Sequence, residues 1–133
     1  MKVKATRGNG FAHALTVRDH VLVADEPQED GGSDTGPKPQ ELLALSLASC
    51  TAITVEMYAD RKGWDVGRLE VEVDYEPDPK GECSRFEVLL KVPPGLSDDQ
   101  MGRIEEIASK CPVHRTLAGG VQIEDRVEIA SNP

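Results

Sequence analysis

The chain has 133 residues, a length that fits one domain (1–133) able to bury roughly two thirds of its unfolded surface. Its 15 Lys and Arg residues and 24 Asp and Glu residues give a net charge of -9, which disfavours nucleic acid and anionic membrane surfaces as partners. Three cysteines without a C-x-x-C pair are too few for a secreted disulfide framework. The N-terminus shows no pattern of a secretory signal, so we expect a cytoplasmic protein.

Residues 1–24 contain three short apolar runs that read as strands. The runs are Val3–Thr6, Phe11–Val17 and Val21–Ala24, joined by the turns Arg7–Gly10 and Arg18–Asp19. Short strands with such close turns predict a small antiparallel meander.

Residues 25–38 form a long segment rich in Gly, Pro, Asp and Ser. A loop of this length in a small domain is usually functional or disordered. It is equally compatible with a rim or lid over a site and with a flexible connector.

A helix is predicted over residues 39–62. Pro39 suits the first helical position, and Glu41 places negative charge near the positive end of the helix dipole. Arg61 and Lys62 supply cations in the last turn, and Gly63 can stop the helix in a left-handed conformation. Its uncharged stretch is shorter than the roughly 20 residues of a membrane span, so we expect a buried helix of a water-soluble fold.

This helix has no clean polar stripe before Glu56, and small residues surround Cys50 near its middle. It therefore needs cover on all sides. Because so short a chain can cover one side but hardly both, the pattern predicts a second copy of the chain and an intimate homodimer.

The second half of the chain predicts a hairpin over 68–92, a helix over 97–110, a short helix over 112–118 and a final strand over 121–130. Apolar and acidic residues alternate through the hairpin, and Ser97 with Gln100 forms a capping box. Pro112 suits a first helical position, and Val121, Ile123, Val127 and Ile129 keep one phase through the last segment. Hairpins segregated from helices favour the α+β class.

Cys50 and Cys111 are the candidate reactive groups. The thiolate is the nucleophile, so a reactive cysteine needs a cation, a hydrogen bond or a helix N-terminus to lower its pKa. Cys111 is predicted to cap a helix, whereas Cys50 lies in mid-helix, where burial alone would raise the pKa of its thiol. Local physics therefore favours Cys111 as the more acidic thiol.

The stretch 36–52, GPKPQELLALSLASCTA, followed by Cys111-Pro112-Val113, resembles the OsmC/Ohr family of hydroperoxide-reducing proteins in motif order and spacing. The resemblance covers nearly the whole chain. It implies an OsmC-like α+β fold in an intertwined homodimer, with Cys50 as the peroxidatic residue that attacks an organic hydroperoxide and Cys111 as the resolving residue. It further implies recycling by a dithiol, small or carried by a lipoyl protein, and no metal or organic cofactor.

The family pattern also has an arginine near the attacking cysteine, oriented by a glutamate ten residues before that cysteine. Here that position is Gln40, with Glu41 next to it. The available arginines are Arg7 and Arg18, and we favour Arg7 because its turn is richer in glycine. An apolar substrate pocket is expected in the dimer interface, lined by Leu43, Leu47, Val55 and Met57.

Other interpretations are open at this point. A disulfide between Cys50 and Cys111 could switch a partner contact in a redox-sensing or binding module without efficient turnover. A metal site is disfavoured, because the cysteines and histidines contain no closely spaced ligand pair. His114 could act as a base for Cys111 or be an ordinary surface group, and Cys83 reads as a bystander thiol.

Overall fold

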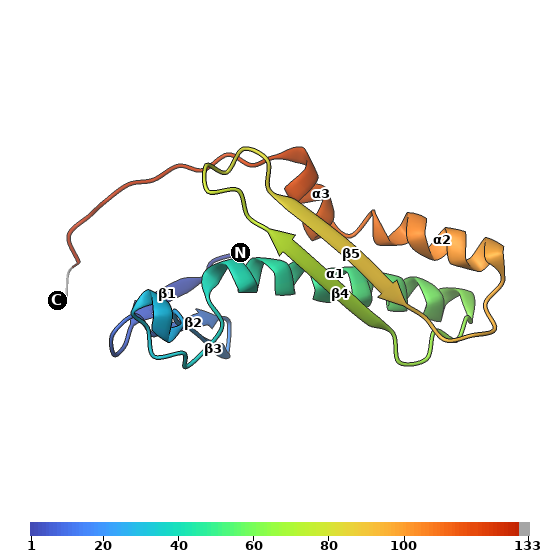
Figure 1. The fold of residues 1–133 in the computed structure, drawn as a ribbon, viewed down its shortest axis with the longest axis horizontal. Coiled ribbons are helices and arrows are strands. Elements are labelled where there is room, and N and C mark those ends of the chain that lie inside the picture. Colours follow the sequence, from blue (N-terminus) through green and yellow to red (C-terminus); the bar gives the residue numbers. More distant parts are fainter. Residues whose placement is uncertain (131–133) are drawn as a thin grey trace.

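The computed structural model describes residues 1–130. A three-stranded sheet is followed along the chain by a long helix, a two-stranded hairpin and two shorter helices (Figure 1). The elements are β1 (Lys4–Arg7), β2 (His13–Val17), β3 (His20–Ala24), the 3-10 turn η1 (Gln28–Asp30), α1 (Pro39–Lys62), β4 (Glu70–Glu76), β5 (Arg85–Lys91), α2 (Asp98–Ala108) and α3 (Pro112–Gly119). The predicted α+β class is confirmed.

The N-terminal strands form an antiparallel meander in the order β1-β2-β3, as the sequence predicts. The turn between β2 and β3 holds Arg18 at a φ of 51°, a left-handed conformation that matches the twist of a two-residue hairpin. The meander lies beyond the first turn of α1 and apart from the hairpin (Figure 1). Its packing is therefore mostly internal.

Helix α1 begins and ends where its signals place it. The Glu41 Oε1 atom accepts a hydrogen bond of 2.9 Å from the backbone N–H of Lys38, which satisfies one donor at the helix start. Gly63 closes the other end at a φ of 72°, where a residue with a Cβ would be strained. By length and composition α1 could cross a membrane, but its packing against β4, α2 and α3 is that of a central helix of the domain.

The core sits at the C-terminal half of α1. Its buried members are Val55, Ala59, Val66, Ile104 and Ala108. Helix α2 contributes the last two of them, after Ser97 caps its start by accepting a hydrogen bond of 3.1 Å from the N–H of Gln100. The N-terminal half of α1 is more open, with Leu43 and Leu45 exposed.

Strands β4 and β5 pair in register from Glu70 opposite Lys91 to Glu76 opposite Arg85. Alternate side chains point to the helices, and Tyr75 stacks on its cross-strand neighbour Phe86 with ring centres 4.2 Å apart. The acidic residues of β4 face outward, as expected of a solvated face. One sheet face thus supports α1 and the other meets water.

The final strand predicted over 121–130 is wrong for a single chain. After α3 these residues run as an extended segment without strand pairing, leading away from the rest of the molecule (Figure 1). The apolar side chains of this segment are exposed, with Val127 100% and Ile129 98% accessible. The segment pairs with neither the meander nor the hairpin, so its backbone groups have no strand partner within residues 1–130.

Candidate active site: a thiol pair between α1 and α3

Cys111 is the N-cap of α3, as its place before Pro112 predicts. Its side chain is fully buried, and its Sγ accepts a hydrogen bond of 3.2 Å from the backbone N–H of His114. The sulfur thus satisfies one of the free amide groups at the helix start. Proline at the first helical position removes another such group, so the local sequence fixes where this thiol lies.

Cys50 and Thr51 face Cys111 from the middle of α1. The Thr51 hydroxyl donates a hydrogen bond of 3.8 Å to the Cys111 sulfur, and the half-buried Cys50 thiol is close enough to act on the pKa of Cys111. Both cysteines are free thiols in this structure. The fold therefore brings together two sulfurs that are 61 positions apart in the sequence.

Burial raises the pKa of the Cys111 thiol, and this effect outweighs the others. The amide of His114 and the hydroxyl of Thr51 act to lower that pKa, while the neighbouring Cys50 acts to raise it further. The place of Cys111 at the helix N-terminus therefore does not lower its pKa on balance, because burial of the sulfur outweighs the two donors.

A groove of about 500 Å³ with both apolar and polar side chains on its walls lies between α1, α3 and the hairpin; we call it the α1–α3 groove. It is lined by Leu43, Leu47, Tyr75, Gly81, Glu82, Ser84, Phe86, Val88, His114, Leu117 and Ala118. Neither cysteine lines this groove. Leu47, three residues before Cys50, and His114, three residues after Cys111, are the lining residues nearest to them along the two helices.

Two of the four residues predicted to form the pocket line this groove, and two do not. Leu43 and Leu47 are on its wall. Val55 is fully buried in the core, and Met57 is 58% exposed elsewhere on α1. Periodicity alone could not separate these positions, because every face of α1 is apolar.

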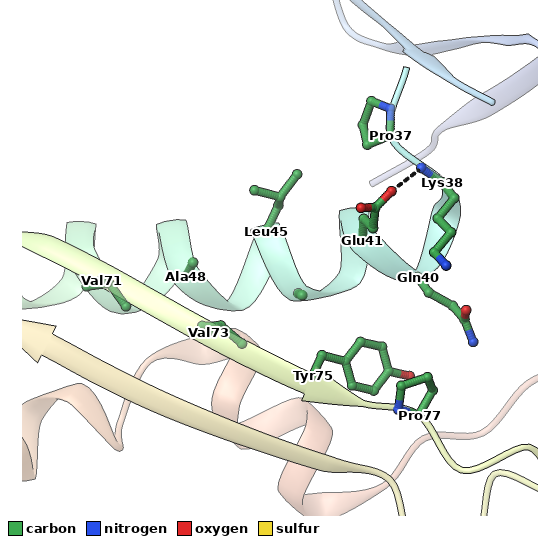
Figure 2. Close-up of a pocket in the computed structure, with 11 residues that line it drawn as sticks. Pro37, Lys38, Gln40, Glu41, Leu45, Ala48, Val71, Val73, Tyr75 and Pro77 are labelled. Atoms are coloured by element: carbon green, nitrogen blue, oxygen red, sulfur yellow. Dashed lines mark hydrogen bonds between the residues drawn. The ribbon is translucent and has the colours of Figure 1, made fainter. Parts of the chain in front are cut away.

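Gln40 and Glu41 line a second hollow, the α1–β4 groove of about 450 Å³, where Figure 2 shows both near the first turn of α1. The opposite wall is β4, with Val73 and Tyr75 pointing to the helix (Figure 2). Glu41 lies at the mouth of this groove, and its carboxylate already accepts the hydrogen bond from the backbone N–H of Lys38. Neither residue is part of the α1–α3 groove lining.

Arg7 is held in its own turn at the end of β1. Its Nε donates a hydrogen bond of 2.8 Å to the carbonyl oxygen of Gly10. Arg18 occupies the β2–β3 turn. Over residues 1–130 the hydrogen bonds and ion pairs join no guanidinium to Cys50 or Cys111, so a single chain does not assemble the arginine with the thiols.

Sequence reasoning missed Asp25, which organises the loop 25–38. Its side chain is only 2% exposed and accepts hydrogen bonds from the amides of Glu26, Ser33 and Thr35 and from the Thr35 hydroxyl. These bonds, led by that from the hydroxyl, lower the pKa of the Asp25 carboxyl. The loop is therefore built around a carboxylate. An aspartate at the start of the segment 25–38, which is rich in Gly, Pro, Asp and Ser, was the available signal.

The remaining candidates have simple placements. Cys83 is exposed in the turn of the hairpin, and His114 lines the α1–α3 groove. Within residues 1–130, no group of three or more His, Cys, Asp or Glu side chains is placed to hold a metal ion.

Two adjacent thiols, one enclosed at the N-cap of α3 and one half-buried in the middle of α1, define a candidate thiol redox site on an α+β scaffold. The OsmC-like protein family model matches residues 31–125, which include both cysteines. The chain therefore belongs to the OsmC-like family, and the resemblance noted from its motifs is confirmed.

An uncharacterized protein of Haloferax volcanii is 30% identical over 118 residues, covering 87% of this chain and 86% of that protein. Among solved structures, an OsmC-like protein from Mycoplasma pneumoniae superposes with a TM-score of 0.75 at 19% identity, over 89% of this chain and 86% of that one. The organic hydroperoxide resistance protein OhrB of Bacillus subtilis gives a TM-score of 0.56 at 26% identity, over 86% and 87% of the two chains. The scaffold is thus that of OsmC and Ohr proteins.

Asp25→Asn should destabilise the protein near neutral pH, because an amide cannot accept all the bonds made to the carboxylate. The folded-state pKa of Asp25 is lowered, so its contribution is present above the ordinary value of about 3.9 and is lost as pH falls through the lower folded value. Urea unfolding should therefore separate the variant from wild type near neutral pH and bring them together in acid. Asp34→Asn, in the same loop and exposed, is the matched control. An Asp25→Asn difference that persists unchanged in acid would contradict this assignment.

Proposed function

We propose that this protein is a thiol-dependent peroxidase that reduces organic hydroperoxides, with Cys50 as the peroxidatic and Cys111 as the resolving cysteine. The observation that carries the proposal is the adjacency of these two free thiols on α1 and α3, the two helices that also form walls of the α1–α3 groove. Of the two, Cys50 is the thiol that a substrate can reach, because Cys111 is fully buried.

The reaction has two steps on the protein. The Cys50 thiolate attacks one peroxide oxygen, the O–O bond breaks, and the alcohol leaves with a proton, so that Cys50 becomes a sulfenic acid. The Cys111 thiolate then attacks the Cys50 sulfur, an S–S bond replaces the S–O bond, and water leaves with the thiol proton. The peroxide takes two electrons in all, and a dithiol restores them by exchange with the disulfide.

Two further observations support an organic substrate. The α1–α3 groove carries aliphatic and aromatic side chains of the kind that contact an alkyl group, together with the polar residues Glu82, Ser84 and His114. OhrB of Bacillus subtilis, 26% identical to this chain, bears the name of an organic hydroperoxide resistance protein. For recycling we propose a dithiol, either small or carried by a lipoyl protein.

Consumption of cumene hydroperoxide with a dithiol should fall by at least about a hundredfold in Cys50→Ser, because the nucleophile is removed. Cys111→Ser should still react once, but its Cys50 should accumulate as sulfinic acid in intact-mass spectra. Cys83→Ser is the control and should keep wild-type turnover. One stoichiometric oxidation of the wild type without turnover would instead favour the redox-sensing alternative.

We propose that Arg7 supplies the cation that ionises Cys50, with Gln40 and Glu41 orienting its guanidinium. In one chain Arg7 bonds to Gly10 in its turn, so this role requires a movement of the meander or delivery from a second copy of the chain. The meander packs mostly on itself and stands at the start of α1, which leaves it free to pack against another molecule (Figure 1).

Arg7→Gln should slow the reaction of Cys50 with peroxide at neutral pH by about tenfold or more, because a nearby cation lowers a thiol pKa by roughly one or more units. Arg18→Gln is the matched control on the other turn of the meander. Stopped-flow measurement of sulfenic acid formation reports this step directly. Equal rates in Arg7→Gln and wild type would remove Arg7 from the site.

We also propose that the protein functions as a homodimer in which the segment 121–130 of each chain packs against the other. The segment keeps apolar side chains in one phase, and they are 64% to 100% exposed in a single chain. Exposed apolar residues also lie on α1, where Leu45, Ile53 and Met57 are 55% to 58% accessible. Apolar surface on this scale is costly in water and fits contact with another protein chain.

Sedimentation equilibrium should give twice the 14.4 kDa chain mass. Val127→Asp combined with Ile129→Asp should shift the protein toward monomer, because both side chains lie in the apolar phase of the segment. Glu128→Gln, between them and out of phase, is the matched control. A wild-type protein that sediments as a monomer at micromolar concentration would exclude the dimer.

A further inference from the structure

Thr51 differs from the two serines of its helix in the group to which its hydroxyl donates. Ser46 and Ser49 donate their hydroxyls to backbone carbonyls three residues back, at 2.7 and 3.2 Å, which is the usual choice for such residues inside a helix. Thr51 directs its hydroxyl at the Cys111 sulfur of another element, 3.8 Å away. The side chain is 1% exposed, so this bond is made out of contact with water.

The sulfur at the other end is equally enclosed. Cys111 is 0% exposed, and its neighbours are the Thr51 hydroxyl, the His114 amide and the Cys50 thiol. Cys50 is the titratable group that faces it from α1, while α3 presents the backbone amide. Two neutral donors therefore point at a sulfur that has no cation bonded to it among residues 1–130.

We propose that Thr51 is a positioning residue for Cys111, whose hydroxyl holds the buried sulfur against Cys50 and stabilises its thiolate for disulfide formation. The inference rests on the proposed peroxidase function, in which Cys111 must lose a proton before it attacks the sulfenic acid at Cys50. An O–H donor in a site without water is well suited to this step, because a hydrogen bond to a charged acceptor is stronger than one between neutral groups.

The hydrogen bond from Thr51 also explains how the buried Cys111 thiol can still lose its proton. Burial disfavours the Cys111 thiolate, and the hydroxyl of Thr51 and the amide of His114 partly offset that cost. The amide contribution is fixed by the backbone of α3. The hydroxyl contribution is set by the residue at position 51 and can be removed by a change that keeps the shape of the side chain.

The first test isolates Cys111 in a Cys50→Ala, Cys83→Ser background and follows its thiolate by ultraviolet absorbance against pH. Thr51→Val should move the midpoint upward by about one pH unit, a roughly tenfold loss of thiolate at any pH below it, because a hydrogen bond to a charged group is lost. Thr51→Ser keeps the hydroxyl and should restore the wild-type midpoint. Thr54→Val, half-buried on the same helix, is the matched control and should leave it unchanged.

The second test uses the chain with all its cysteines and treats it with cumene hydroperoxide. Thr51→Val should accumulate Cys50 sulfinic acid several-fold faster than Thr51→Ser, because slower attack by Cys111 leaves the sulfenic acid open to a second peroxide. Equal titration midpoints in Thr51→Val and Thr51→Ser would overturn the role of Thr51. If Thr51→Val shifts the midpoint but the wild-type chain forms no disulfide with peroxide, the hydrogen bond from Thr51 to Cys111 is supported and the peroxidase function is overturned.

Discussion

The Cys111 sulfur is enclosed where the first turn of α3 meets the middle of α1, and the candidate site depends on this contact. Its bonds come from the His114 amide of its own helix and from the Thr51 hydroxyl of the other. A sulfur held in this way joins two segments that are far apart in the sequence. It also fixes the distance from which Cys111 can reach Cys50.

Burial of the Cys111 sulfur has two opposing consequences for the proposed chemistry. It protects Cys111 from peroxide and from external thiols, which confines its reactions to its neighbour Cys50. It also makes the thiolate harder to form, and donors placed at the sulfur become correspondingly important. Cys50 is the more exposed of the two thiols, which is why we assign it the first step of the proposed reaction and Cys111 the second.

Three parts of the single chain have few contacts with the rest of it. The meander packs mostly on itself, the segment 121–130 pairs with no strand within residues 1–130, and the outer face of α1 is apolar and exposed. Arg7 belongs to the first of these surfaces and is bonded within its own turn. A second copy of the chain would cover all of these surfaces and would be the simplest source of a cation for Cys50.

The sequence by itself determined the local structure: helix α1 from Pro39 to Lys62, the caps at Ser97 and Cys111, and the register-defining alternation of the hairpin. These follow from short-range signals such as proline placement, capping side chains and periodicity. Only the tertiary structure decided that Thr51 meets Cys111, that Val55 is core rather than pocket, and that Asp25 organises its loop. Each of these depends on which groups the fold brings together and how fully it removes them from water. That information lies in the packing of distant segments and in no local pattern.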